Sequence, residues 1–160
     1  MKVLVGTDFH GKESVFKAFA ETAEQNKVDV MVACGDVTHF GSLQEAQRLL
    51  SILTGIKIPV LFVPGNCDPP SLAKVDIIGA TCIHGRNVSF GDLTFIGIGA
   101  SPPTPFNTPF ELTEDEIKET LNQASKILPA TKWVVLVSHP PPFGTKLDET
   151  SFRLHVGSSS

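Results

Sequence analysis

VDVMVACGDVTH, residues 28–39, is an apolar run that passes directly into a glycine, a carboxylate and an imidazole. Its apolar part predicts a strand that is buried on both faces, as the strands of parallel sheets are. Similar apolar runs lie on either side of it, with an amphipathic segment in each interval. Strands are therefore expected at 2–6, 28–33 and 59–63, and helices at 12–26 and 42–55. With right-handed crossovers these strands lie parallel, and their carboxyl ends meet at one edge.

The pattern changes near residue 80, where a second sheet is expected to begin. Shorter strands are expected at 81–84, 88–90 and 93–98, the last two joined by a hairpin turn at Gly91-Asp92. The proline-rich segment that follows, 101–109, predicts a loop bordering the functional site.

The last third of the chain predicts one helix and one strand. Thr113 and Glu116 form a capping box that starts a helix running to about residue 128. A buried strand is expected at 133–137, ending in Ser138-His139. No linker or internal repeat interrupts the sequence, so residues 1–160 are expected to form a single domain.

The composition is that of an ordinary globular protein, with 41% hydrophobic and 19% charged residues. A formal net charge of -4 and the lack of a basic stripe argue against nucleic acid as a ligand. No run approaches the ~20 apolar residues of a membrane span, so no membrane association is expected. Cys34, Cys67 and Cys82 lack the spacing of a metal finger or a disulfide framework, which indicates reduced thiols and a cytoplasmic location.

Polar residues of a similar kind close four of the expected strands. They are Asp8-Phe-His10, Gly35-Asp36-Val-Thr-His39, Gly65-Asn66-Cys67-Asp68 and Ser138-His139. Ligands of open α/β sheets bind beyond the carboxyl ends of the strands, so these side chains are expected to gather in one place.

Carboxylate and amide oxygens combined with imidazole nitrogens suit Mn, Fe, Zn, Ni or Co better than Ca or Mg. Asp8 and His10, two residues apart in an extended chain, are expected to point to the same side and to hold one ion. Asp36 is placed to bridge to a second ion. Two such ions ~3.5–4 Å apart clamp a phosphate and activate a water for attack at phosphorus, without a protein nucleophile.

Taken in order, D-x-H, G-D-x-x-H, G-N-C-D and a later strand-end histidine resemble the calcineurin-like metallophosphoesterase superfamily. The G-N-C-D form is similar to its small prokaryotic phosphodiesterases. The resemblance implies a four-layer α/β/β/α sandwich of class α/β with a dimetal centre at one edge. It also implies metal ligands, namely Asp8 and His10 on one ion, Asp36 as the bridge, and Asn66 and His139 on the other.

The resemblance extends to catalysis, which it assigns to Asp36, Asn66, His39 and Cys67. Cys67 stands where many members carry a histidine that acts as general acid, and a thiol with a pKa of about 8.5 is a poorer acid–base group there. His39 stands where the phosphoprotein phosphatases carry an aspartate, so its role is left open between a partner of the site and a surface-loop residue. The chain has no tyrosine, which excludes the purple acid phosphatase branch.

The sequence departs from the family pattern at its end. The G-H-x-H motif is absent, and His155 is the only histidine after His139. The expectation is therefore a truncated chain that lacks the last strands of its second sheet and exposes a flank. Each metal site would lack one imidazole, which weakens metal binding and leaves the activity of this form in doubt.

Two readings of function remain. The first is metal-dependent hydrolysis of a small phosphoester, most of all a phosphodiester. The alternative is a non-catalytic scaffold of the same fold that binds protein partners. Asp8 and Asp36 could each merely cap a helix, but that account leaves His10, Asn66 and His139 as coincidences.

Overall fold

The computed structural model describes residues 1–75, 77–149 and 155–160 of the chain. Its first sheet is parallel, with the strand order β1-β2-β3-β4. Its second sheet has the order β5-β6-β7, in which β6 runs antiparallel to β5 and parallel to β7. The strands are β1 (Val3–Gly6), β2 (Val30–Cys34), β3 (Val60–Val63), β4 (Ala80–Cys82), β5 (Asn87–Phe90), β6 (Leu93–Ile98) and β7 (Trp133–Ser138).

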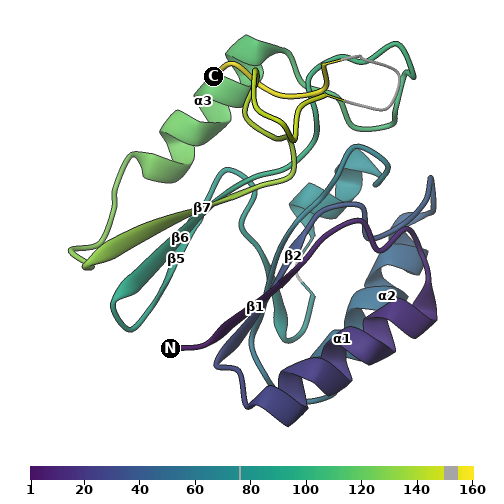
Figure 1. Ribbon diagram of the computed structural model, residues 1–160, viewed down its shortest axis with the longest axis vertical. Helices are drawn as coiled ribbons and strands as arrows, with labels where there is room; N and C mark the ends of the chain where they lie inside the picture. Colours follow the sequence, from purple (N-terminus) through teal and green to yellow (C-terminus); the bar gives the residue numbers. More distant parts are fainter. Residues whose placement is uncertain (76, 150–154) are drawn as a thin grey trace.

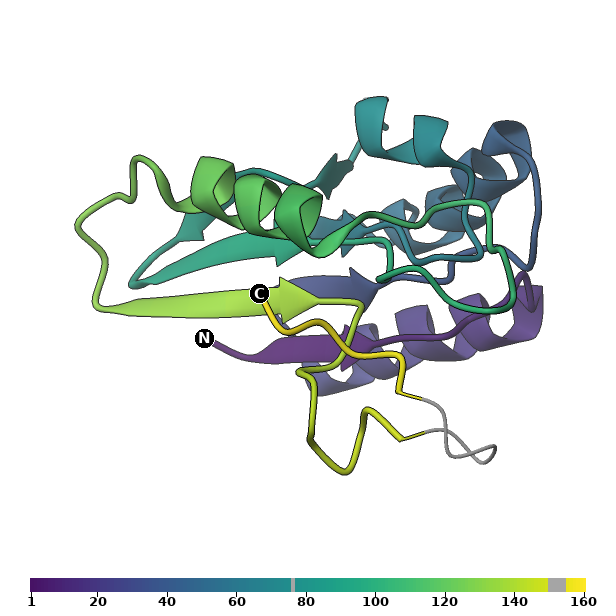
Figure 2. The same ribbon diagram turned by 90° about the horizontal axis from the view of Figure 1, so that it is seen from above.

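The elements form four layers (Figures 1 and 2). Helices α1 (Glu13–Asn26) and α2 (Leu43–Thr54) cover one face of the first sheet, the second sheet packs on its other face, and α3 (Glu114–Ser125) lies outermost. A short 3-10 helix, η1 (Pro70–Lys74), lies between β3 and β4. Phe62 belongs to the core cluster on the helix side, whereas Leu61 packs between the sheets with Phe95. The expected four-layer α/β/β/α sandwich is therefore confirmed.

Local sequence accounts for the helices. On α2, Ser42 caps the first turn by accepting a hydrogen bond from the Glu45 amide at 3.2 Å. Its apolar residues recur at helical spacing and are buried at Ala46, Leu49, Leu50 and Leu53. On α3, the predicted capping box between Thr113 and Glu116 is present.

The assignment of 81–84 to the second sheet was wrong. β4 pairs with β3 in the first sheet, where Ala80 lies opposite Val60 and Cys82 opposite Phe62. The physical reason is the alternation of side chains along a strand, which places Ala80 and Cys82 together in the core beneath the helices. The hairpin at Gly91-Asp92 is confirmed, and the second sheet begins with β5.

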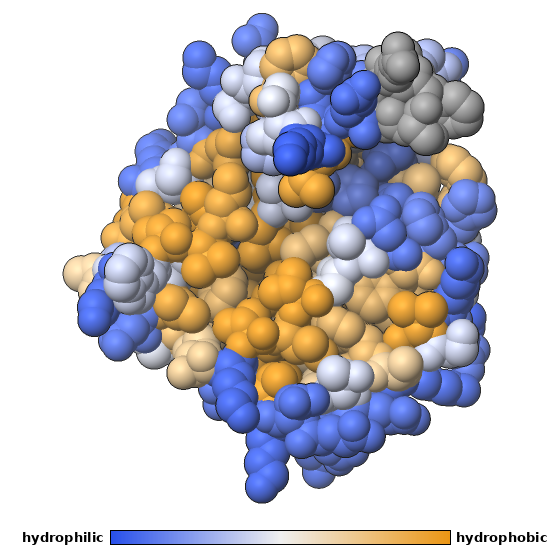
Figure 3. All heavy atoms as spheres, in the orientation of Figure 1, coloured by the Kyte–Doolittle hydropathy of each residue, from blue (hydrophilic) through white to orange (hydrophobic). Residues whose placement is uncertain are grey.

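The expectation that the strands are buried on both faces was wrong for β1 and β7. β2 and β3 are buried, but Val5 on β1 is 59% exposed, and Trp133, Val134 and Leu136 on β7 are 60%, 49% and 53% exposed. These strands are the last of their sheets, and no strand of the described residues pairs with their outer edges. Figure 3 shows the resulting apolar surface. We call Val5, Trp133, Val134 and Leu136 the apolar flank.

Candidate metal centre

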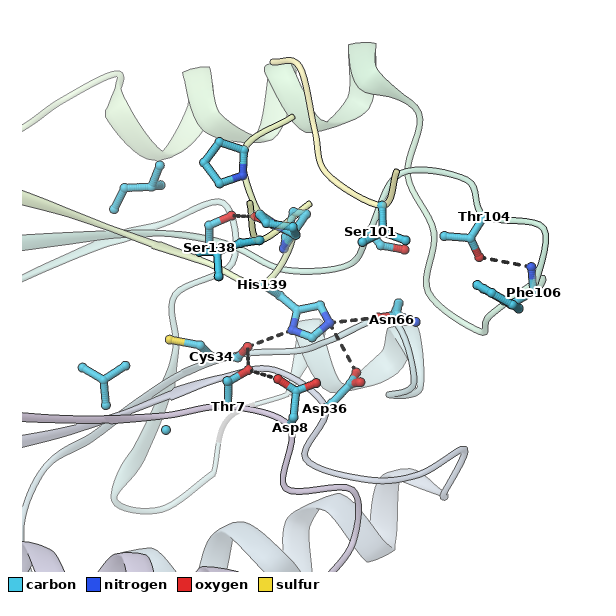
Figure 4. A pocket seen from close by; sticks show the side chains of 18 residues that line it. Thr7, Asp8, Cys34, Asp36, Asn66, Ser101, Thr104, Phe106, Ser138 and His139 are labelled. Carbon is cyan, nitrogen blue, oxygen red and sulfur yellow. Dashed lines mark hydrogen bonds and ion pairs between the residues drawn. The ribbon is translucent and has the colours of Figure 1, made fainter. Parts of the chain in front are cut away.

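The loops that follow β1, β2, β3 and β7 converge on one cleft of about 750 Å³ (Figure 4). Asp8, Asp36, Asn66 and His139 line this cleft, and His10 lies beside the two carboxylates. The structure thus brings together all five of the side chains that the sequence suggested as metal ligands.

The first group consists of Asp8, His10 and Asp36. The His10 Nε2 atom lies 3.6 Å from an oxygen of Asp8 and 3.6 Å from Asp36 Oδ2. The ligand atoms of the three residues all lie within 4.8 Å of one another, which is close enough for one ion to contact them together. The hydroxyl of Thr7 lies 2.7 Å from Asp8 Oδ2 and supports that carboxylate.

The backbone between Asp8 and His10 is not extended, contrary to the expectation from the sequence, although both side chains point to the same side of the loop. Both residues adopt left-handed backbone conformations, with φ of 57° and 47°. The loop curls because the amides of Asp8 and His10 donate to the carbonyls of Gly35 and Asp36, at 3.2 and 2.8 Å. A left-handed conformation costs a residue other than glycine roughly 1–2 kcal/mol, and such strain is typical of functional sites.

The second group consists of Asp36, Asn66 and His139. The His139 Nδ1 atom lies 2.8 Å from the carbonyl oxygen of Cys34, and since a carbonyl only accepts, Nδ1 carries the hydrogen. In the neutral ring, Nε2 then directs a lone pair at Asn66 Oδ1, at 2.8 Å, and at Asp36 Oδ1, at 3.5 Å. An imidazole nitrogen, an amide oxygen and a carboxylate oxygen that face one another are a ligand set that fits a divalent ion.

Asp36 joins the two groups. One of its carboxylate oxygens faces His10 and the other faces His139, and the residue is only 3% exposed. The Cys67 amide donates to Asp36 Oδ1 at 2.9 Å and holds the carboxylate in place. This is the placement that a carboxylate bridging two ions requires.

Two glycines allow the Asp36 loop to approach His139 and the Asn66 loop closely. A side chain at Gly35, whose φ is +92°, would overlap the His139 ring. A side chain at Gly65 would overlap both the carboxylate and the amide of Asp36. The glycines that precede Asp36 and Asn66 in the two motifs are therefore needed for space at the site.

Asp68 is the supporting residue that the sequence reasoning missed. It is fully buried, and its carboxylate accepts from the amides of Gly65, Val37 and Thr38 and from the Thr38 hydroxyl, at 2.9, 3.0, 2.7 and 2.9 Å. Burial raises the pKa of this carboxyl, and the four hydrogen bonds oppose the shift. Asp68 clamps the Asp36 loop to the Asn66 loop. The available signal was its place in a loop before two prolines, where aspartate often binds backbone amides.

The two remaining candidates are His39 and Cys67, of which His39 lies at the Nδ1 side of the His10 ring and Cys67 lies next to Asp36 and Asn66. His39 is exposed, and its Nδ1 atom lies 3.4 Å from Nδ1 of His10. Cys67 is buried, and that burial, reinforced by the charge of Asp36, raises the pKa of its thiol to about 12. A thiol with so high a pKa is poorly suited to act as an acid–base group near neutral pH.

The walls of the cleft are largely apolar. Thr104 and Phe106 contribute from the proline-rich loop, which agrees with the prediction that this loop borders the site. Further apolar lining comes from Val5, Leu136, Pro140, Pro141, Pro142 and Leu147. Neither lysine nor arginine occurs among the described residues that line the cleft. None of the described helices is long and apolar enough to cross a membrane.

Comparison with known proteins agrees with the family resemblance described from the sequence. A family model described as calcineurin-like phosphoesterase matches residues 1–157. The Methanocaldococcus jannaschii protein MJ1162 is 40% identical over 168 residues, which cover 100% of this chain and 71% of the relative.

Two solved structures share the fold. The protein TT1561 of Thermus thermophilus aligns with a TM-score of 0.72 over 98% of this chain and 72% of its own, at 15% identity. A second crystal structure aligns with a TM-score of 0.75 over 98% of this chain and 76% of its own, also at 15% identity. At this identity the two structures establish the fold alone.

Proposed function

This chain belongs to the calcineurin-like phosphoesterase family, and on that premise we propose that it hydrolyses small phosphodiesters with the help of two divalent ions. The family supports metal-dependent phosphoester hydrolysis in general. The observation that carries the proposal is the position of Asp36, whose two oxygens lie 3.6 Å from His10 and 3.5 Å from His139.

The residues divide into two ligand sets that share Asp36. Asp8 and His10 would hold one ion, and Asn66 and His139 the other. Oxygen and imidazole ligands favour Mn, Fe, Co, Ni or Zn. When bound, such a pair supplies a Lewis acid for the phosphoryl oxygens and lowers the pKa of water. Asp68 positions Asp36 and Asn66 by clamping their loops together.

The cleft supports a diester rather than a monoester. Its volume of about 750 Å³ and its apolar walls leave room for an organic group on each side of the phosphorus.

The test compares bis-p-nitrophenyl phosphate with p-nitrophenyl phosphate in the presence of excess Mn²⁺. We expect faster turnover of the diester, loss of turnover with a chelator, and a fall in kcat of about a hundredfold or more in Asp36→Asn. The exposed Asp115→Asn variant on α3 serves as the charge-matched control and should keep full activity. Hydrolysis that persists without metal, or that Asp36→Asn leaves intact, would refute the proposal.

A specific observation favours one second candidate, the scaffold reading. The apolar flank lies along β1 and β7, and exposed apolar patches commonly mark protein interfaces. If the chain binds Mn²⁺ tightly but turns over neither ester, partner binding becomes the better account.

A further inference from the structure

Three side chains with softer ligand atoms meet beside the centre described above. They are His10, His39 and Cys67, and their ligand atoms all lie within 4.8 Å of one another. Each follows a different strand of the first sheet, namely β1, β2 and β3. The thiol and the His39 ring belong to neither ligand set of the proposed hydrolytic centre.

Backbone hydrogen bonds hold the three loops together independently of any ion. The Phe40 amide donates to the Cys67 carbonyl at 3.1 Å, which ties the His39 loop to the Cys67 loop. The Gly11 amide donates to the Val37 carbonyl at 3.0 Å, which ties the His10 loop to the same segment. The rings of His10 and His39 contact each other edge to face, with centroids 5.2 Å apart. The cluster is therefore preorganised.

We propose that His10, His39 and Cys67 form a second cation site, which shares His10 with the hydrolytic centre and takes a thiophilic divalent ion such as Zn²⁺ or Co²⁺. Two imidazoles and a thiolate are a ligand set that such ions accept, with a fourth position left to solvent. Because Cys67 is buried and His39 is exposed, the ion would sit at the surface with its open position outward. The thiol proton is released to solvent when the ion binds.

This site and the hydrolytic centre exclude each other at His10. Its Nε2 atom faces the Asp8 and Asp36 carboxylates, whereas its Nδ1 atom faces His39. A neutral imidazole has one lone pair, so it ligates on one side and carries the hydrogen on the other. An ion held through Nδ1 leaves an N–H directed at the carboxylates, which withdraws His10 from the hydrolytic centre. A thiophilic ion thereby acts as an antagonist of the ion held by Asp8 and Asp36.

The experiment is a Co²⁺ titration of the 160-residue chain, followed by the ultraviolet thiolate-to-cobalt charge-transfer band. Wild type should show the band, and Cys67→Ala should lack it. The matched control is Cys82→Ala, which removes a buried cysteine of β4 and should keep the band. His39→Ala should require about ten times more Co²⁺ to reach half of the band intensity. Circular dichroism verifies that each variant is folded.

Asp8→Asn separates this site from the proposed hydrolysis. It removes one carboxylate ligand of the hydrolytic centre but leaves His10, His39 and Cys67 in place. The thiolate-to-cobalt band should therefore persist when phosphodiester turnover is lost. The proposal is overturned if wild type shows no thiolate band, if the band survives in Cys67→Ala, or if it disappears in Cys82→Ala. A chain that shows the band but no turnover under any metal would contradict only the proposed function.

Discussion

At the scale of single residues, Asp68 shows how one side chain holds two loops of the site. Replacing it with alanine leaves the amides of Gly65, Val37 and Thr38 without an acceptor in the interior. Each unsatisfied buried donor costs roughly 1–3 kcal/mol, so Asp68→Ala should lower the free energy of unfolding by about 3 kcal/mol or more.

Urea unfolding in a chelating buffer measures this loss. Asp115→Asn, an exposed change, should stay within about 0.5 kcal/mol of wild type. A loss below about 1 kcal/mol for Asp68→Ala would mean that water reaches these amides and replaces the carboxylate.

Gly65 makes a different kind of contribution, because it provides space. A methyl group there would push Asp36 away from its position between His10 and His139. Gly65→Ala should therefore weaken Mn²⁺ binding at least about tenfold in isothermal titration.

The control for this prediction is Gly55→Ala. Gly55 ends α2 with a φ of -62° and has no contact closer than 3.4 Å at the added carbon, so alanine should leave Mn²⁺ affinity unchanged. Equal affinities in wild type and Gly65→Ala would show that Asp36 tolerates the displacement.

At the scale of secondary-structure elements, α3 depends on its first turn. The Thr113 hydroxyl accepts from the Glu116 amide at 3.3 Å, and Glu116 accepts from the Thr113 amide at 2.8 Å. Thr113→Ala removes half of this capping box and should destabilise the protein by about 1 kcal/mol, whereas Thr113→Ser should restore most of that loss. Thermal unfolding followed by circular dichroism compares the two. Equal losses in both variants would argue that the methyl group, not the hydroxyl, matters.

The segment after β7 is held by Asp148, which is fully buried. Burial alone would raise its pKa, but hydrogen bonds from the amides of Gly144, Gly157 and Val156 and from His155 lower it to about 2. A lowered folded-state pKa contributes stability above the unfolded value of 3.8, and this contribution is lost as the pH falls through about 2.

The pH dependence of unfolding tests this contribution. The stability difference between wild type and Asp148→Asn should be largest above pH 3.8 and should shrink towards pH 2. The difference is the quantity to compare, because the other carboxylates titrate in both proteins. A difference that stays constant over this range would contradict the assigned hydrogen bonds.

At the scale of the whole molecule, the apolar flank is an exposed apolar surface, and such surfaces promote binding to apolar ligands and to other copies of the chain. Val134→Lys combined with Leu136→Lys should reduce binding of an apolar fluorescent dye and reduce self-association in sedimentation experiments. Ile127→Lys, at an 81% exposed position outside the flank, is the control and should change neither. Unaltered dye binding in the double variant would show that the dye binds to a surface other than the apolar flank.

Much of the fold follows from local patterns. The parallel first sheet, the hairpin at Gly91-Asp92 and the capping box at Thr113 were predicted because periodicity and turn chemistry are properties of neighbouring residues. The convergence of Asp8, Asp36 and Asn66 was also predicted, because β1, β2 and β3 are parallel strands of one sheet and end at one edge. His139 follows β7 of the second sheet, so its place at the site depends on how the two sheets pack. The family resemblance then supplied the four-layer arrangement.

Other features depend on partners that are distant in the sequence. The pairing of β4 with β3, the curled loop at Asp8 and His10, and the clamp at Asp68 all arise from hydrogen bonds between separate loops or strands. Side-chain types and their order along the chain are local information, so they were enough to indicate a metal-binding phosphoesterase. Packing in three dimensions determines which side of the His10 ring faces which ligand and how much of β7 is exposed to solvent. The order of residues along the chain does not contain this information.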